Sequence, residues 1–376
     1  MEQHEEVFFR TLRSALWGET LQIPEGFSNW GKVMKLAKAQ AVTGLVGDVI
    51  LRTPEIMASL PDKAAEYVQE IPMKNIVMHT VLNNTLILAV KTLRDHGIEP
   101  VLLKGQGLAR YYPVPELRQC GDIDLYVGEE NYEKAYEALK GVVTEIDEKE
   151  AAMSYDKHFH AKIGAVQIEI HRFASILNCP KKNKRFQEYA MKGFTNDCVK
   201  VKIGATCILL PNDTFNVYYV FHHLLHHFLS SGVGVRHFCD LACLLHAKQE
   251  LFDDHELKNI LVGMKELRAW QIVGCILVEN MGYPQSEFPF YNPGMMKYAD
   301  RMTRIMMVEG NFGHETPFRK PAHYGYFRGK LYSFMFGTKR ILRLSTIFPR
   351  EMMSRFYYMI RNGLVRMFDE LRERSF

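Results

Sequence analysis

Two aspartates separated by one residue are the clearest candidates for chemistry in this chain. Asp122 and Asp124 lie in the segment Cys120-Gly-Asp-Ile-Asp-Leu-Tyr-Val. Because the side chains of a strand alternate, both carboxylates share one face, while Ile123 and Leu125 take the other. Two unpaired acids on one face repel each other. A divalent cation, normally Mg²⁺ with its preference for oxygen, is therefore their natural partner.

A third acid lies on a later apolar segment, Val166-Gln-Ile-Glu-Ile-His-Arg, in which Glu169 and His171 share the polar face. If this strand lies beside the first acidic strand, three carboxylates meet. Such a set can hold two metal ions about 3.5–4 Å apart, the arrangement used for in-line displacement at phosphorus. We therefore predict a two-metal site formed by Asp122, Asp124 and Glu169.

A glycine-containing turn precedes the acidic strand. Lys104 ends a short apolar run, and Gly105, Gln106 and Gly107 open a short helix. Backbone N–H groups at such a turn can bind phosphate oxygens, and Lys104 adds a positive charge. The spacing matches neither a P-loop nor a dinucleotide-binding fingerprint. The turn is therefore informative mainly because it stands ahead of the Asp-x-Asp pair.

Three further charged residues, Arg118, Arg236 and Asp240, can form ion pairs. Arg118 has two interpretations, a contact with phosphate or an ion pair with Asp122. Arg236 and Asp240 are four residues apart on an expected helix, where an ion pair contributes only a few tenths of a kcal/mol.

The order of these segments resembles the polymerase-beta-type nucleotidyltransferase superfamily. The resemblance rests on a strand, a Lys-Gly-x-Gly turn, a short helix, an Arg-x-x-Gly-Asp-Ile-Asp-Leu-Tyr-Val strand and a later acid-bearing strand. Within it, the chain is most similar to a bacterial group of nucleotidyltransferase-like proteins with Leu-Lys-Gly and Arg-x-x-Gly-Asp-x-Asp signatures. That group also carries an acid-x-His pair, as in Glu169-Ile-His171, and paired histidines followed by Arg and Asp, as in His222–His227, Arg236 and Asp240. The similarity covers roughly residues 75–250.

The resemblance implies a transfer of a nucleoside monophosphate from an NTP to a hydroxyl of an acceptor, with pyrophosphate leaving. It implies that Asp122, Asp124 and Glu169 bind two Mg²⁺ ions and that the Gly105–Gly107 turn holds the triphosphate. Two details depart from the superfamily: the turn reads Gly-Gln-Gly instead of Gly-Gly or Gly-Ser, and the third acid is Glu instead of the commoner Asp. The residues expected to line the cleft are His171, His223, His227, Arg236 and Asp240.

Two other classes of function stay open at this point. A nucleotide-binding protein without catalysis would keep the fold and the turn, whereas a structural or regulatory helical protein would need neither. The sequence also leaves open which NTP is used and whether the acceptor is a small molecule, a sugar, a protein side chain or RNA.

The run His222-His-Leu-Leu-His-His places His222 over His226 and His223 over His227 on a helix, a spacing that can bind zinc. A zinc protease would need His-Glu-x-x-His, and no glutamate stands in the run. The alternatives are a helix face that lines the nucleotide cleft and core histidines that bond to the backbone.

The elements that must position these residues follow from periodicity. Residues 1–97 predict helices with breaks at Pro24, Pro54, Pro61 and Pro72; the clearest helix, Met73–His96, should end at Gly97 in a left-handed cap. Residues 98–210 predict strands at Val101–Leu103, Ile123–Val127, Val142–Ile146, His158–Ile163, Val166–Ile170 and part of Val199–Leu210. Helices are expected between the early strands, at Gly107–Tyr112 and Glu130–Lys140. The later strands are expected to follow one another directly. From Asp213 onward the helical period returns, with helices at Thr214–Leu229, Arg236–Lys248, Glu256–Met281, Met295–Val308 and Lys330–Arg374.

These elements predict an α+β protein in which a small mixed β-sheet, the nucleotidyltransferase core, is flanked by helical N- and C-terminal regions. The expected domains are residues 1–97, 98–210 and 211–376. The chain has 376 residues, of which 47% are hydrophobic and 24% charged, and this length favours more than one domain. The net charge of +4 is too small to indicate a nucleic-acid-binding protein by itself.

The expected location is the cytoplasm. Seven scattered cysteines without a C-x-x-C pair favour reduced thiols, the N-terminus is acidic, and no apolar run approaches the ~20 residues of a membrane span. The segment Lys330–Phe376 carries ten Lys and Arg against four acids, with aromatic residues between them. It favours a helix that packs its aromatic stripe on the core; contact with nucleic acid or an anionic membrane surface is the alternative.

Overall fold

Seven strands form one mixed sheet in the computed structural model of this chain, which describes residues 1–147, 157–314 and 326–373. The order across the sheet is β3-β4-β5-β2-β1-β7-β6. The pairs β2–β5 and β1–β7 are parallel, and the other neighbouring pairs are antiparallel. The strands are β1 (Val101–Leu103), β2 (Asp122–Tyr126), β3 (Glu145–Ile146), β4 (His158–Ile163), β5 (Val166–His171), β6 (Val199–Ile203) and β7 (Thr206–Leu210). The predicted α+β class with a mixed sheet and flanking helices is confirmed.

The helices between the strands agree with the expectation in two cases and differ in one. The short helices α6 (Gly105–Ala109) and α7 (Tyr132–Leu139) lie where the sequence predicts them. Helix α9 (Pro180–Thr195) separates β5 from β6, although these strands are expected to follow one another directly. The helical period of α9 is hard to recognise in the sequence, because the segment is rich in lysine and its apolar stripe is narrow. In that stripe Phe186 and Ala190 are buried four residues apart.

Five helices precede the sheet. They are α1 (Gln3–Trp17), α2 (Trp30–Ala39), α3 (Thr43–Leu51), α4 (Pro54–Ser59) and α5 (Asp62–Asp95). The expected break at Pro72 is wrong, because α5 continues through this proline. A proline inside a helix costs one backbone hydrogen bond, and the burial of Val68 and Ile71 in the preceding turn holds the helix together there. The predicted left-handed cap is confirmed at Gly97, with φ +71°.

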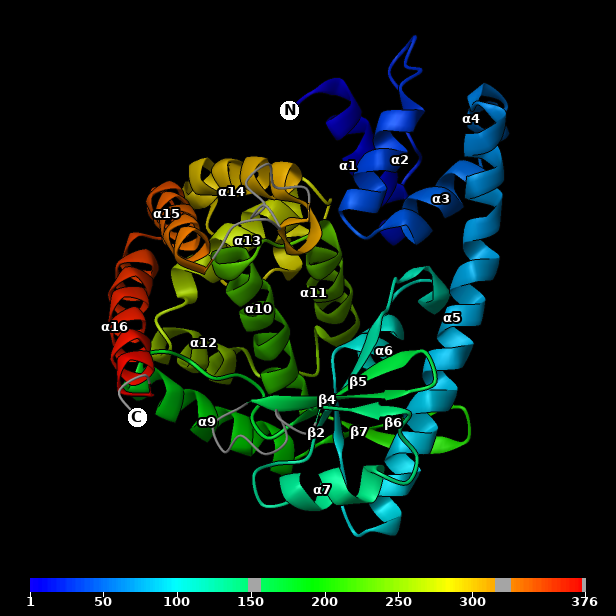
Figure 1. The fold of residues 1–376 in the computed structure, drawn as a ribbon. Helices are drawn as coiled ribbons and strands as arrows, with labels where there is room; N and C mark the ends of the chain where they lie inside the picture. Colours follow the sequence, from blue (N-terminus) through cyan, green and yellow to red (C-terminus); the bar gives the residue numbers. More distant parts are fainter. Residues whose placement is uncertain (148–156, 315–325, 374–376) are drawn as a thin grey trace.

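Helix α5 is, within the described residues, the single helix long and apolar enough to cross a membrane by length and composition, with a mean hydropathy of 1.4 over its most apolar stretch. This differs from the expectation that no run approaches that length. About 44% of the stretch is buried inside the protein, and a core helix of a soluble protein passes the same test. Figure 1 shows α5 running from the N-terminal helices down past the sheet.

Among the described residues, seven α-helices follow the sheet: α10 (Asp213–Ser230), α11 (Val235–Lys248), α12 (Asp254–Gly263), α13 (Leu267–Glu279), α14 (Met296–Glu309), α15 (Tyr326–Ser345) and α16 (Pro349–Glu373). Two predicted helices are each divided. The segment Glu256–Met281 breaks before Leu267, where Lys265 has φ +59°. The C-terminal segment turns before Pro349, so α15 and α16 pack against each other.

The described part of the basic C-terminal segment packs on the protein. Leu344, Phe348 and Met352 are buried, and Arg340 is paired with the buried Glu309 at 2.6 Å. Phe356 and Tyr357 are exposed. Arg374 and the side chains of Lys330, Arg366 and Arg372 lie outside the described residues, so contact with nucleic acid or a membrane surface stays an untested alternative.

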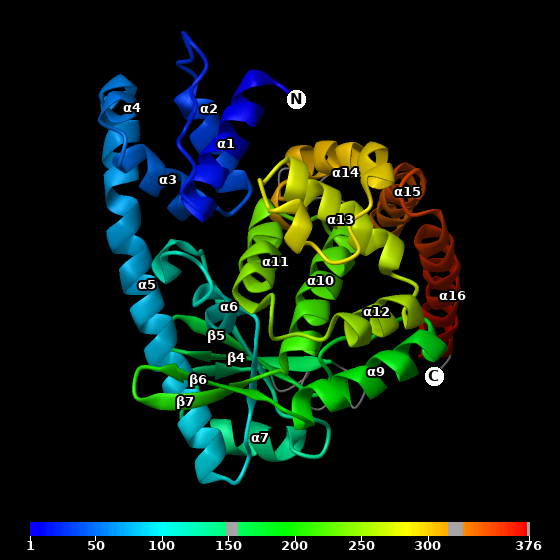
Figure 2. The ribbon, with the colours of Figure 1, turned by 180° about the vertical axis from the view of Figure 1, so that it is seen from behind.

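The sheet separates two packing environments. One face, with Ile123, Leu125 and Ile168, packs on α5 and α7 in a compact apolar cluster. The opposite face carries the polar side chains of Asp122, Asp124 and Glu169. Helices α10 and α11 lie on this side of the sheet (Figures 1 and 2). A second and larger cluster joins buried residues of α1, β1 and α10, among them Phe8, Leu103 and Phe221. The division into three domains therefore stays a prediction.

Candidate active site

The polar face of the sheet is assembled by the register of three neighbouring strands. Parallel pairing of β2 with β5 sets Asp124 opposite Glu169. Antiparallel pairing of β4 with β5 sets His160 opposite Glu169 and His158 opposite His171. Because directly paired residues point to the same face, the acids and histidines of separate strands gather there. The predicted adjacency of the two acid-bearing strands is confirmed.

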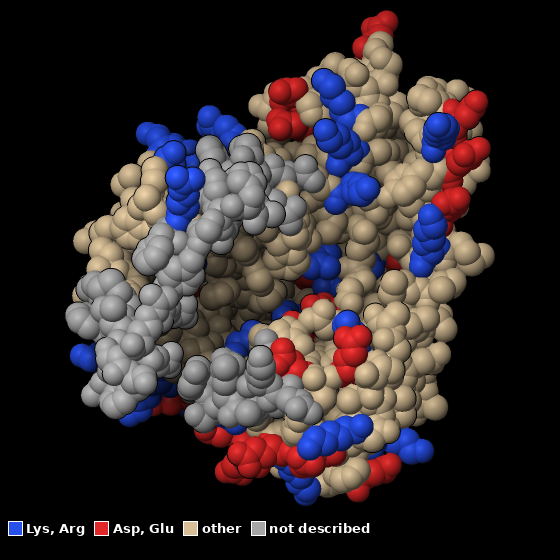
Figure 3. Space-filling model, viewed as in Figure 1, with Lys and Arg blue, Asp and Glu red and all other residues tan. Residues whose placement is uncertain are grey.

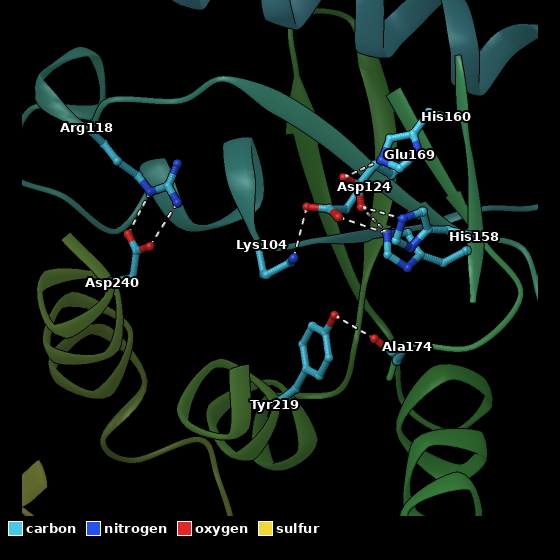
Figure 4. Close-up of polar contacts among 10 residues, drawn as sticks. Lys104, Arg118, Asp124, His158, His160, Glu169, Ala174, Tyr219 and Asp240 are labelled. Carbon is cyan, nitrogen blue, oxygen red and sulfur yellow. Dashed lines mark hydrogen bonds and ion pairs between the residues drawn. The ribbon is translucent and has the colours of Figure 1, made fainter. Parts of the chain in front are cut away.

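Asp124 is buried, with 3% of its surface exposed, and each of its oxygens has a partner. Oδ1 accepts a hydrogen bond from His171 Nε2 at 2.8 Å, and Oδ2 lies 3.1 Å from Lys104 Nζ (Figure 4). Burial alone would raise the pKa of this carboxyl, but the Lys104 ammonium and the His171 hydrogen bond hold it well below its usual range. The Asp124 carboxylate in turn keeps the pKa of Lys104 above its ordinary value despite burial. Asp124 is therefore ionised and already balanced by a cation.

Asp122 lies at the accessible edge of the face and makes no hydrogen bond or ion pair within the part of the chain that the structure describes. Partial loss of water around the carboxyl, together with the charge of Asp124, raises its pKa above the ordinary value. Asp122 therefore lacks the cation that Asp124 has in Lys104. Carboxylate oxygens are the ligands that Mg²⁺ prefers, and an ionised carboxylate has several acceptor positions, so the acids of this face fit a divalent ion.

Glu169 completes the acidic group and lies among histidines (Figure 4). Its Oε2 is 3.3 Å from His171 Nε2 and 3.7 Å from His158 Nε2, and its Oε1 is 3.3 Å from His160 Nε2. Burial would raise the pKa of Glu169, but the hydrogen bond from His171 lowers it to about 2. Glu169 is therefore negatively charged at neutral pH.

The turn after β1 brings one cation and one glycine to the cavity. Lys104 has φ +53° and ψ −138°, a conformation that costs a non-glycine residue free energy, and Gly105 follows with φ +45°. The other two residues of the predicted nucleotide-binding turn point elsewhere. The Gln106 amide donates to Asn83 Oδ1 at 2.7 Å, inside the protein. A Cβ on Gly107 would lie 2.7 Å from a Leu210 methyl, so its small size serves packing on β7.

Arg118 pairs with Asp240, and the alternative pairing with Asp122 is wrong. Its Nε and Nη2 donate to the two carboxylate oxygens at 2.6 and 2.8 Å (Figure 4). Tyr112 donates its hydroxyl to the same carboxylate at 2.7 Å. Both charged residues are about 5% exposed. The expected pair between Arg236 and Asp240 is also not formed, since Arg236 donates to the Gln119 carbonyl at 2.9 Å. A phosphate contact by Arg118 stays a prediction.

These groups surround a cavity of about 250 Å³ between the sheet and helices α10 and α11. Figure 3 shows this face of the molecule hollowed in its middle, with acidic and basic side chains together at the base of the hollow. Among the described residues the cavity is lined by Lys104, Gly105, Leu108, Arg118, Asp122, Asp124, Lys157, His158, Glu169, Val220, His223, His227, Arg236, His237, Asp240 and Phe312. Of the residues expected in the cleft, His171 lies behind this lining in contact with Asp124, and the other four reach it.

Three imidazoles form the wall opposite the acids. The ring centroids of His223 and His227 are 4.3 Å apart, and His237 lies 5.7 and 5.6 Å from them. Burial lowers the pKa of all three, with nearby cations adding to the effect, and the pKa of His227 falls to about 4. This wall is therefore neutral at neutral pH.

The predicted histidine run divides between two places. His222 does not reach the cavity, because it pairs with Glu266 at 3.2 Å in the helical region. Within the described ranges, the one group of three side chains spaced to hold a metal is His158, Glu169 and His171, which contains none of the run. The zinc interpretation of the run thus has no third ligand here.

Six residues of the lining lack a site prediction from the sequence: Leu108, Lys157, His158, Val220, His237 and Phe312. Alternation along His158–Ile163 gives a signal for His158, since Phe159 and Ala161 are buried on the opposite face. Lys157 and Phe312 carry no local signal, because chain segments far apart in sequence bring them to the cavity.

Comparison with known proteins identifies the family of this chain. Residues 27–278 match the model of a family described as uncharacterised nucleotidyltransferase. A solved structure of an antigenic nucleotidyltransferase-like protein from Paracoccidioides brasiliensis is similar at 13% identity and a TM-score of 0.31, over 55% of this chain and 92% of that one. No curated protein matches the chain. Since the family model covers well over half of the sequence, the chain belongs to this family of uncharacterised nucleotidyltransferases.

Proposed function

We propose that the protein is a Mg²⁺-dependent enzyme that transfers a nucleoside monophosphate from an NTP to a hydroxyl of an acceptor. The observation that carries the proposal is the direct pairing of Asp124 with Glu169 across β2 and β5, with Asp122 on the same face. Family membership supports nucleotidyl transfer in general. The metal, the nucleotide and the acceptor are parts of the proposal.

In this proposal Asp122 and Asp124 hold one Mg²⁺ and Glu169 completes a second position. When bound, Mg²⁺ supplies stabilisation of the charge that develops on the phosphate oxygens and lowers the pKa of the acceptor hydroxyl. The two acids with lowered pKa, Asp124 and Glu169, are ionised at neutral pH and so available as ligands.

The cations of the cavity bind the triphosphate. Lys104 contacts Asp124 in this structure and can turn to phosphate once a metal neutralises that carboxylate. Lys157, the residue before β4, and Arg236 on α11 reach the same cavity. The neutral imidazoles of His223 and His227 accept a hydrogen bond from the acceptor hydroxyl without repelling these cations.

The test is the release of pyrophosphate from each of the four common NTPs with Mg²⁺ and a panel of hydroxyl acceptors (a sugar, RNA and the protein itself), by the full-length protein and its Glu169→Gln variant. The substitution removes charge but little volume. We expect transfer to fall by at least about 100-fold, in line with loss of a transition-state group, while Mg-nucleotide binding partly survives. Binding is read from the melting temperature, because a ligand at 100 times its Kd adds about 2.7 kcal/mol of stability.

Glu137→Gln is the matched control, since Glu137 is an exposed acid on α7 outside the cavity. It should leave both transfer and binding unchanged. Undiminished turnover in Glu169→Gln would exclude the assigned role of Glu169. Nucleotide binding without pyrophosphate release would favour a binding protein, and the absence of both would favour a structural role.

A further inference from the structure

The two ends of the acidic face have different chemistry. Asp122 and Asp124 offer oxygen atoms, whereas Glu169 is surrounded by imidazole nitrogens. Glu169 Oε1 lies 3.3 Å from His160, and its Oε2 faces both His171, at 3.3 Å, and His158, at 3.7 Å. Figure 4 shows His158 and His160 converging on this carboxylate from β4.

The separations around Oε2 fit ligands of one metal ion better than hydrogen bonds. An N–H···O hydrogen bond spans 2.7–3.2 Å, so the contact at 3.7 Å is too long and that at 3.3 Å is weak. Ligands at about 2.0–2.1 Å from a tetrahedral zinc ion lie about 3.4 Å from one another. The potential ligand atoms of His158, Glu169 and His171 all lie within 4.8 Å of one another.

The backbone holds this group in place. His158 and His171 are direct partners on β4 and β5, and Glu169 lies two residues before His171 on the same face. Both rings turn Nε2 toward Glu169, while their Nδ1 atoms are buried and have no hydrogen-bond partner in the described part of the chain. His171 is fully buried, so two paired strands of the sheet support the group and no loop movement is needed to form it.

We propose that His158, Glu169 and His171 bind a transition-metal ion, Zn²⁺ among the common ones, in preference to Mg²⁺. Imidazole with one carboxylate is a donor set that suits zinc and its neighbours, whereas Mg²⁺ demands oxygen. Binding exchanges the hydrogen bond between His171 and Asp124 for a bond to the metal. The inference rests on the proposed function in one respect, that Glu169 belongs to the catalytic cavity. If zinc binds here, the Glu169 side of that cavity is a nitrogen-containing metal site, and Asp122 and Asp124 form the Mg²⁺ side.

Zn²⁺ is titrated calorimetrically into the metal-free, full-length protein without nucleotide, in the presence of millimolar Mg²⁺. We expect one tight site per chain, with two imidazole nitrogens at about 2.0–2.1 Å from zinc in X-ray absorption. His158→Ala should weaken zinc binding by more than about 100-fold, beyond the loss seen when only a supporting partner of a ligand is removed. His255→Ala, an exposed histidine on α12, is the matched control and should leave the affinity unchanged.

Zinc affinity that is the same in His158→Ala as in the wild type, or zinc that millimolar Mg²⁺ displaces, would overturn the proposal. His158 is the variant of choice because its side chain is 21% exposed, and the melting temperature reports whether the variant folds. If His158→Ala does not fold, His158→Gln removes the nitrogen ligand with less loss of volume. Because these titrations contain no nucleotide, a negative result leaves the Mg²⁺-dependent pyrophosphate assay as a separate test of the proposed function.

Discussion

The pair Arg118 and Asp240 connects the loop before β2 to helix α11 by two hydrogen bonds in a nearly dry environment. Burial of two charges is costly, and their attraction offsets that cost only while both are present. The nearby Arg118 guanidinium holds the pKa of the Asp240 carboxyl below its usual range despite burial. Tyr112 also donates a hydrogen bond to Asp240, but the neutralisation of its charge depends on Arg118.

At the residue scale we predict that Arg118→Met lowers the free energy of unfolding by about 3–5 kcal/mol, because it leaves the Asp240 charge buried and unpaired. Urea denaturation followed by circular dichroism measures the change. The double variant Arg118→Met with Asp240→Leu should recover most of the loss. Arg110→Met is the control, since Arg110 is exposed, and a loss in Arg118→Met no larger than in this control would contradict the prediction.

The same residues show what a sequence can indicate about a site. Asp122, Asp124 and Glu169 are predictable because strand alternation is local, and one assumption about strand adjacency brings them together. The partner of Arg118 is 122 positions away in the chain, and nothing near either residue indicates the other. Gln106 is a similar case, since its partner Asn83 lies on α5.

At the scale of elements, helix α6 lies very close to β7. The contact between Gly107 and Leu210 leaves no space for a methyl group. We predict that Gly107→Ala destabilises the fold by about 1–3 kcal/mol, the usual cost of overpacking, and that it does so without a specific loss of nucleotide affinity.

A double-mutant cycle measures this contact, because Leu210→Val removes a methyl group at the same place. The cost of Gly107→Ala should be smaller in the Leu210→Val background than in the wild type. Gly141→Ala serves as the control, since a Cβ there meets no atom within 4 Å. Equal costs in both backgrounds would show that the close approach is not what requires a glycine.

Element types were easier to predict than element ends. The strands follow from short apolar runs, and the long C-terminal helices follow from their period. The breaks at Lys265 and before Pro349 depend on how each helix packs on its neighbours. The continuation of α5 through Pro72 is likewise a result of tertiary burial that outweighs a local preference.

At the scale of the whole molecule, the cavity joins the sheet to the C-terminal helices, and folding buries neutral histidines at this junction. An unfolded histidine has a pKa of about 6.5, whereas His227 in the fold has a pKa of about 4. Between these values the unfolded chain binds more protons than the folded chain. Stability therefore rises with pH in this window and falls as the pH drops from about 6.5 toward 4.

We predict that the melting temperature decreases as the pH is lowered from 7 to 5, and that His227→Gln makes this decrease less steep. The comparison of the two slopes separates the contribution of the His227 imidazole to stability from that of the carboxylates, which is lost at lower pH. Thermal unfolding at a constant ionic strength measures both slopes. Parallel slopes would contradict the prediction.

The cavity also has a simple balance of charge. Among its described residues, four acidic and four basic side chains line it, so their formal charges cancel. A bare triphosphate would make this space strongly negative, and bare divalent ions would make it positive, but the two together restore neutrality. Under the proposed function, nucleotide and metal are therefore thermodynamically linked: each raises the affinity for the other by the same factor, and neither affinity has a single value unless the concentration of the other is stated.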